Sequence, residues 1–123
     1  MSEKFKKIVV MDFDGVIHSY KSGWKGVTEI PDPPVEGVKE FIEELRENYL
    51  VIVFSSRTCS SEGIYAIKEW LCLNGIEVDD VVEHKPPAYL SIDDRAICFN
   101  GSFDGLKEQI DTFEPWTKKR KLL

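Results

Sequence analysis

The sequence has few cysteines and no hydrophobic run long enough to cross a membrane. Its apolar runs, such as 8–11 and 50–54, fall far short of the roughly 20 residues that a membrane-spanning helix needs. The apolar stretch after the basic start MSEKFKK is too short for a signal peptide, which predicts a cytoplasmic protein. Cys59, Cys72 and Cys98 have no paired spacing, so we expect buried free thiols and neither a disulfide framework nor a zinc motif.

Basic residues are scarce outside the C-terminus. The chain carries 16 Lys and Arg against 22 Asp and Glu, a net charge of −6. The last ten residues contribute +3, so residues 1–113 carry −9. Such an acidic body argues against broad nucleic-acid binding. If the protein handles phosphate, something positive must offset this charge.

The 123 residues suffice for one domain, and a composition of 42% apolar and 31% charged residues is that of a globular protein. Short β-branched runs alternate with segments of helical spacing, which predicts a layered α/β fold around a mainly parallel sheet. A Gly- and Pro-rich flap loop is expected at 15–34, and a basic tail at 117–123. Strands are expected at 8–11, 50–54, 78–83, 89–92 and 96–99, and helices from the double proline to Asn48, at 61–74 and at 105–113.

Each expected helix has an apolar stripe that should face the sheet. These inward positions are Val38, Phe41, Ile42 and Leu45, then Ile64, Ile67, Trp70 and Leu71, and finally Leu106, Ile110 and Phe113. His18 in the flap is expected at the surface, whereas Tyr20 and Trp24 are expected to pack the flap against the body.

Polar side chains cluster where the expected strands end. In a parallel sheet, the loops after the strands meet at one edge, where ligands bind. Each cluster also has an ordinary explanation, because Asp-Gly is a common turn and serines cap helices. Their joint placement favours a site. The clusters are Asp12-Phe13-Asp14-Gly15, Ser55-Ser56-Arg57, His84-Lys85 and Asp93-Asp94.

Four carboxylates in these clusters suggest a metal. In an extended segment the side chains of Asp12 and Asp14 point to one side, and close carboxylates repel each other unless a cation or a proton lies between them. Asp93 and Asp94 add further oxygen donors. Hard oxygen ligands without a Cys or His cluster favour Mg²⁺, which would also offset the negative charge of the body.

The motifs together resemble the haloacid dehalogenase (HAD) superfamily. An apolar strand followed by DxDG matches residues 8–15, although Val16 stands where the family often has Thr. A strand ending in Ser matches 51–55, a lysine matches Lys85, and a strand ending in paired acids matches 90–94. The resemblance covers residues 8–99. It implies a single HAD-like hydrolase domain over residues 1–123 with a three-layer, Rossmann-like fold.

This resemblance implies a Mg²⁺-dependent phosphatase that acts through an aspartyl-phosphate. Asp12 would be the nucleophile, Asp14 the acid and base, and Lys85 a charge-neutralising group. The implied metal ligands are Asp12, Asp14 through its backbone carbonyl, Asp93 and Asp94. The implied substrate-binding residues are Gly15, Ser55, Ser56 and Arg57.

The segments that carry cap domains in HAD enzymes are short here, so we expect no cap and an open site. An open site suits a bulky phosphate such as a nucleic-acid end, and SSR at 55–57 and DDR at 93–95 resemble the phosphatase domain of polynucleotide kinases. Alternatively, oligomerisation could close the site over a small nucleotide or sugar phosphate. Two non-catalytic alternatives are a receiver-type module, whose motif order differs, and a HAD-like domain that only binds phosphate.

Overall fold

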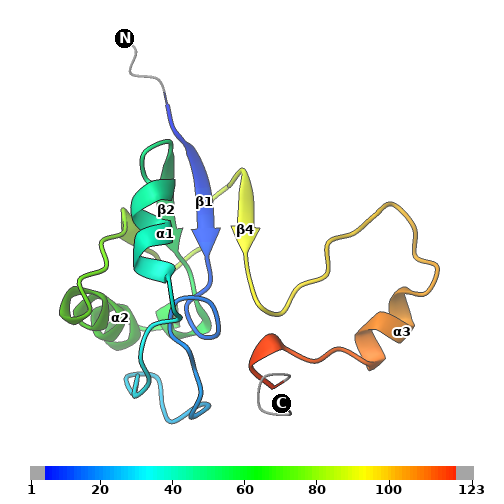
Figure 1. Ribbon diagram of the computed structural model, residues 1–123, viewed down its shortest axis with the longest axis horizontal. Coiled ribbons are helices and arrows are strands. Elements are labelled where there is room, and N and C mark those ends of the chain that lie inside the picture. The colour runs from blue at the N-terminus through cyan, green and yellow to red at the C-terminus, as the bar shows by residue number, and fades with distance from the viewer. Residues whose placement is uncertain (1–4, 119–123) are drawn as a thin grey trace.

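The structure is a computed structural model that describes residues 5–118, and it has an α/β architecture (Figure 1). Its four strands form one all-parallel sheet in the order β3-β2-β1-β4, which confirms the expected α/β class with a mainly parallel sheet. No helix in residues 5–118 has the length and apolarity needed to cross a membrane. The elements are β1 (Lys7–Met11), α1 (Val38–Leu45), β2 (Tyr49–Val53), a 3₁₀ turn η1 (Ser56–Cys59), α2 (Ser61–Leu73), β3 (Asp80–Val81), β4 (Leu90–Ile92) and α3 (Leu106–Asp111).

The core lies between one face of the sheet and the helices α1 and α2. Side chains alternate along a strand, and the register pairs Val9 with Val51 and Met11 with Val53, so these four share a face. Helices α1 and α2 cover these four strand residues with apolar side chains at the helical spacing that the sequence predicts. The buried helix positions are Val38 and Ile42 on α1, with Ile67, Trp70 and Leu71 on α2.

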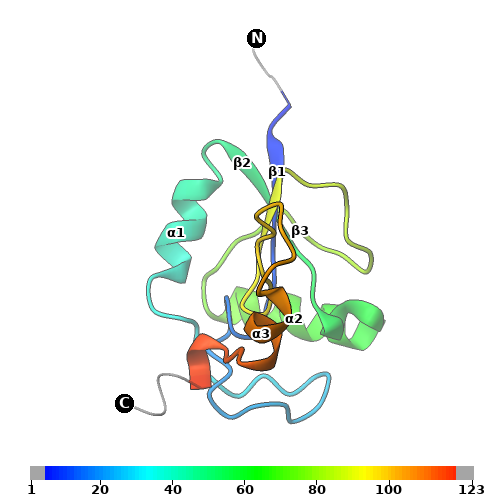
Figure 2. The ribbon, with the colours of Figure 1, turned by 90° about the vertical axis from the view of Figure 1, so that its right-hand side faces the viewer.

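The second face of the sheet is covered without a helix. Val10 and Ile52 lie on this face and are nearly inaccessible. The connection from β3 to β4 runs from one edge of the sheet to the other, and it passes on the side opposite α1 (Figure 2). The described chain thus has α1 and α2 on one face and the irregular segment 82–89 on the other, and the expected three layers stay a prediction.

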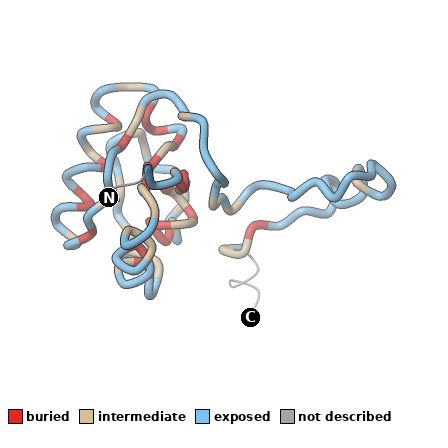
Figure 3. Tube along the Cα trace, turned by 90° about the horizontal axis from the view of Figure 1, so that it is seen from above, coloured by how far each residue is buried: buried red, intermediate tan, exposed pale blue. Residues whose placement is uncertain are grey.

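The prediction for residues 96–113 was wrong in two respects. Residues 96–99 form no strand, and the apolar positions of α3 do not face the sheet. Instead, the chain leaves the body after Asp94 and projects outward (Figures 1 and 3). Ile110 is 58% exposed and Phe113 is 40% exposed. None of the residues of α3 is buried.

Other expectations about burial also need correction. All three cysteines are free, but each is exposed rather than buried. Cys72 follows Leu71 on α2, and the turn of about 100° per residue carries it off the inner face. Phe41 is 43% exposed although it falls in the stripe of α1, whose contacts with the core come from Val38, Ile42 and Leu45.

An ion pair joins the end of α1 to the sheet. Arg46, at the C-terminus of α1, donates two hydrogen bonds to the carboxylate of Asp79, of 2.8 and 3.2 Å. The same carboxylate accepts the Val51 N–H at 2.7 Å. Burial opposes ionisation of Asp79, but these partners outweigh it, so the pKa of Asp79 is lowered.

We expect Asp79→Asn to lower the free energy of unfolding by about 1 kcal/mol at pH 7, because the lost pair is partly screened by solvent. Since the folded pKa lies below the unfolded value of about 3.9, the contribution is present above that pH and is lost as the pH falls further. The difference from the unmodified protein should therefore shrink in acid. Urea denaturation across a pH series measures it, with the exposed Glu47→Gln as control. A constant difference down to strong acid would contradict the assignment.

Candidate metal and phosphate site

The loops after three neighbouring strands meet at the carboxyl edge of the sheet. The Asp12 N–H donates to the Ile92 carbonyl at 2.9 Å, which joins the end of β1 to the end of β4. The Phe54 N–H donates to the Met11 carbonyl at 3.1 Å, which joins β1 to β2. The fold therefore brings the first, second and fourth sequence clusters to one edge, as the parallel order predicts.

Three carboxylates gather at this edge. One oxygen from each of Asp12, Asp93 and Asp94 lies within 4.8 Å of the others. The side chain of Asp94 is only 4% exposed, and its buried Oδ1 has no hydrogen-bond partner in the described chain. Gly15 allows this close approach, because a Cβ at its position would collide with the Asp94 carboxylate and its φ of 84° disfavours other residues.

The clustering shifts the acidity of these groups. Burial, together with the neighbouring Asp93 and Asp94, raises the pKa of Asp12 to about 7. Burial also raises the pKa of Asp94. A bound cation would offset the repulsion that opposes full ionisation here. The orphaned Asp94 oxygen and the all-carboxylate donor set fit a hard divalent cation such as Mg²⁺.

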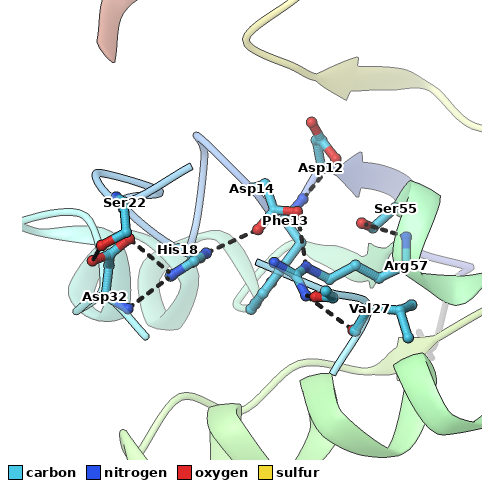
Figure 4. A network of polar contacts seen from close by, with 10 residues as sticks. Asp12, Phe13, Asp14, His18, Ser22, Val27, Asp32, Ser55 and Arg57 are labelled. Atoms are coloured by element: carbon cyan, nitrogen blue, oxygen red, sulfur yellow. Dashed lines mark hydrogen bonds and ion pairs between the residues drawn. The ribbon is translucent and has the colours of Figure 1, made fainter. Parts of the chain in front are cut away.

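Asp14 does not join this group, because its carboxylate is held by other residues (Figure 4). His18 Nδ1 lies 2.8 Å from one oxygen, and Arg57 Nε donates to the other at 2.9 Å. Burial raises the pKa of Asp14, but these two partners lower it more, and the net shift is downward. The side chain is thus fixed as an oriented carboxylate.

His18 is completely buried, so its expected surface position was wrong. Its Nε2 lies 3.1 Å from the Asp32 N–H, which can only donate. The other nitrogen, Nδ1, therefore carries the proton in the neutral ring and donates it to Asp14. The ring also stacks on Phe13 and packs against Trp70. A single histidine in a Gly-rich loop gives no sequence signal of such a position.

Arg57 is also completely buried, and its guanidinium ties the flap to the body. Besides Asp14, it donates to the carbonyls of Gly26 and Val27, both at 2.9 Å. The Trp24 ring, itself half exposed, lies 4.8 Å from the guanidinium carbon. These contacts make Arg57 a positioning residue for Asp14 and the flap, and its Nη2 is buried without a hydrogen-bond partner in residues 5–118. Its expected role in substrate binding stays a prediction.

The remaining expected site residues differ in how far they are buried. Ser55 is buried at the end of β2 and caps η1 by accepting the Arg57 N–H at 3.1 Å. Ser56 is exposed. Lys85 is exposed in the segment 82–89, and it has no hydrogen bond or ion pair with residues 5–118. Most of the basic tail lies outside the described residues.

Both the N–H and the carbonyl of Gly15 form hydrogen bonds within the protein. Its N–H donates to the His18 carbonyl at 2.8 Å, and its own carbonyl accepts the Trp116 indole N–H at 2.6 Å. The contact with Trp116 joins the end of the described chain to the loop after β1. The sequence contains no motif that indicates it.

Comparison with known proteins assigns this chain to no group. It matches no protein-family model, no curated protein and no solved structure.

We expect Arg57→Gln to lower the free energy of unfolding by about 3 kcal/mol, because it leaves Asp14 with one partner and frees two flap carbonyls. Amide hydrogen exchange at residues 20–30 should also accelerate. Arg95→Gln is the matched control, since the Arg95 side chain is 60% exposed and should contribute little. Urea denaturation and exchange mass spectrometry measure both effects. Equal stability of the two variants would refute the positioning role of Arg57.

Proposed function

We propose that this protein is a Mg²⁺-dependent phosphomonoester hydrolase that acts through an aspartyl-phosphate. The observation that supports this most directly is the group of three carboxylates, Asp12, Asp93 and Asp94, at the carboxyl edge of a parallel sheet. It coincides with the DxDG and paired-acid motifs that resemble the HAD superfamily. Ser55 follows the adjacent strand β2, where that resemblance expects a hydroxyl for the phosphoryl group.

In the proposed reaction, a carboxylate oxygen of Asp12 attacks phosphorus and the bond to the ester oxygen breaks. The departing oxygen takes up a proton, and water then cleaves the aspartyl-phosphate to regenerate Asp12. Asp14 accepts a proton from the attacking water and passes it to the departing oxygen in the next turnover, and His18 and Arg57 hold its carboxyl group in orientation. Mg²⁺, held by Asp12, Asp93 and Asp94, would supply positive charge to the phosphoryl oxygens.

The proposed substrate is a bulky phosphate such as a nucleic-acid end, because the sequence leaves no room for a large cap over the site. A small nucleotide or sugar phosphate is the second candidate. It gains support from the exposed apolar projection beside the body, since an oligomer could cover the site. A substrate panel separates these two classes.

We expect phosphate release that requires Mg²⁺, stops with EDTA and is abolished by Asp12→Asn, since an amide is a poor nucleophile. The panel comprises oligonucleotides with 3′- or 5′-phosphate, mononucleotides, sugar phosphates and phosphopeptides. Glu47→Gln, an exposed carboxylate variant, is the control and should retain full activity. Near-normal activity of Asp12→Asn would overturn the assignment of the nucleophile. Without any turnover, a rise in melting temperature with Mg²⁺ that Asp12→Asn removes would favour the binding-only alternative.

Lys85→Ala tests the proposed neutralising lysine. We expect turnover to fall by about two orders of magnitude, the loss typical of removing one charge-stabilising group. Lys68→Ala, which alters an exposed lysine of α2, is the matched control. Since Lys85 is exposed, the unfolding free energy should barely change. A loss in turnover below about threefold would make Lys85 an ordinary loop residue.

A further inference from the structure

A pocket lies between the flap and the end of the described chain, two segments that are far apart in sequence but adjacent in space (Figure 2). Its volume is about 300 Å³, at the low end of the range for small-molecule sites. None of the three clustered carboxylates lines it. Its main lining residues are Ser19, Pro34, Val35, Trp116 and Thr117.

Backbone contacts hold the walls of this pocket in place. The two ends of the flap are paired, since the Ser19 N–H donates to the Pro33 carbonyl at 2.9 Å. The Trp116 indole N–H donates to the Gly15 carbonyl at 2.6 Å, which fixes the end of the described chain against the same loop. The pocket is therefore formed before any ligand binds, and a preformed site lowers the entropic cost of binding.

The hydroxyl of Ser19 points to a ligand. Ser19 is only 3% exposed, and its buried Oγ has no hydrogen-bond partner in residues 5–118. An unpaired buried hydroxyl lowers the stability of the folded protein. Because Ser19 lines the pocket, and because a hydroxyl both donates and accepts, a polar group of a bound molecule can supply the missing partner.

The other lining residues define the chemistry of that molecule. Trp116, Pro34 and Val35 are half-buried, and they offer an aromatic ring and aliphatic surface. Such a wall suits a planar ring, which stacks on an aromatic side chain. Lys21 and Glu36 also line the pocket, but both are exposed and their charges are opposite. The lining therefore fits a small, planar, uncharged ring with a polar edge.

A nucleobase combines these properties better than the alternatives. A sugar has no planar face, and the two charges of a free amino acid would be held only by the exposed Lys21 and Glu36, which interact weakly in solvent. The pocket also borders the candidate site. Gly15 accepts the indole N–H of Trp116 and lies against the carboxylate of Asp94.

We propose that this pocket binds a nucleobase, and that it thereby holds the base of a nucleotide or nucleic-acid end whose phosphate reacts at the carboxylates. The second part of this statement rests on the proposed function, whereas binding of the base does not. Among the candidate substrates, the pocket selects nucleotides and nucleic-acid ends over sugar phosphates, which lack such a ring.

We expect isothermal titration calorimetry in EDTA to detect one adenosine per chain, and no binding of ribose or phenylalanine. Ser19→Ala should weaken adenosine binding about fivefold, the worth of one hydrogen bond, without lowering the melting temperature, because it removes an unpaired buried hydroxyl. Ser61→Ala, an exposed position on α2, is the matched control and should bind normally. Absent adenosine binding, tighter binding of phenylalanine or an unchanged affinity in Ser19→Ala would overturn the proposal.

Two variants of Trp116 test the stacking surface. Trp116→Phe and Trp116→Leu both lose the hydrogen bond to Gly15, but only the first keeps an aromatic face. We expect Trp116→Phe to retain most of the adenosine affinity and Trp116→Leu to lose about tenfold or more. Tyr65→Leu removes an exposed ring on α2 and should bind adenosine normally. Equal affinities of the Phe and Leu variants would contradict a stacked base.

Asp12→Asn separates this inference from the proposed function. Its adenosine affinity should match that of the unmodified protein, because Asp12 does not line the pocket. In an active enzyme, Ser19→Ala should raise the KM for a nucleotide about fivefold and leave the KM for a sugar phosphate unchanged. Adenosine binding without release of phosphate from any substrate would contradict the proposed function alone. Equal effects of Ser19→Ala on both KM values would contradict the base site.

Discussion

The position of β1 in the sheet determines the geometry of the candidate site. β1 is paired in parallel with β2 on one side and β4 on the other. Its last hydrogen bonds, from Phe54 to Met11 and from Asp12 to Ile92, fix the loops after all three strands relative to one another. Residues more than 80 positions apart in sequence therefore meet as neighbouring carboxylates. A strand at the sheet edge could not align two loops in this way.

The carboxylates at this edge are stabilised in two different ways. Asp14 has two fixed donors, so its buried charge is compensated within the protein. Asp12 and Asp93 each accept one backbone N–H, from Phe13 and Arg95, and the Arg95 side chain lies 4.0 Å from Asp94. The three carboxylates nevertheless lie close to one another, and the buried Asp94 Oδ1 has no hydrogen-bond partner in residues 5–118. Close carboxylates repel each other, and a protonated acid or a bound cation relieves that repulsion. Burial and this repulsion raise the pKa of Asp12, whereas the two fixed donors lower the pKa of Asp14.

The sequence predicted the features that depend on local pattern. The β-branched runs before Asp12, Ser55 and Asp93 predicted strands and a shared edge for these residues, because parallel strands place their carboxyl ends together. The burial of His18 and Arg57 was not predictable, since it depends on flap carbonyls and on the Asp32 N–H rather than on a motif. A polar side chain in a loop looks the same in sequence whether it faces water or satisfies buried groups.

The failed prediction for the last helix has a physical cause that bears on the whole molecule. Helical spacing shows that Leu106, Ile110 and Phe113 can share a face, but it does not show which surface that face meets. In the structure, the segment 82–89 passes over the second face of the sheet, and residues 95–114 project from the body instead of returning to it (Figure 2). Both ends of this projecting segment lie beside Gly15, since Asp94 approaches that glycine and Trp116 donates to its carbonyl. The segment 95–114 is thus tied at both ends to the edge of the sheet that carries Asp12 and Asp14.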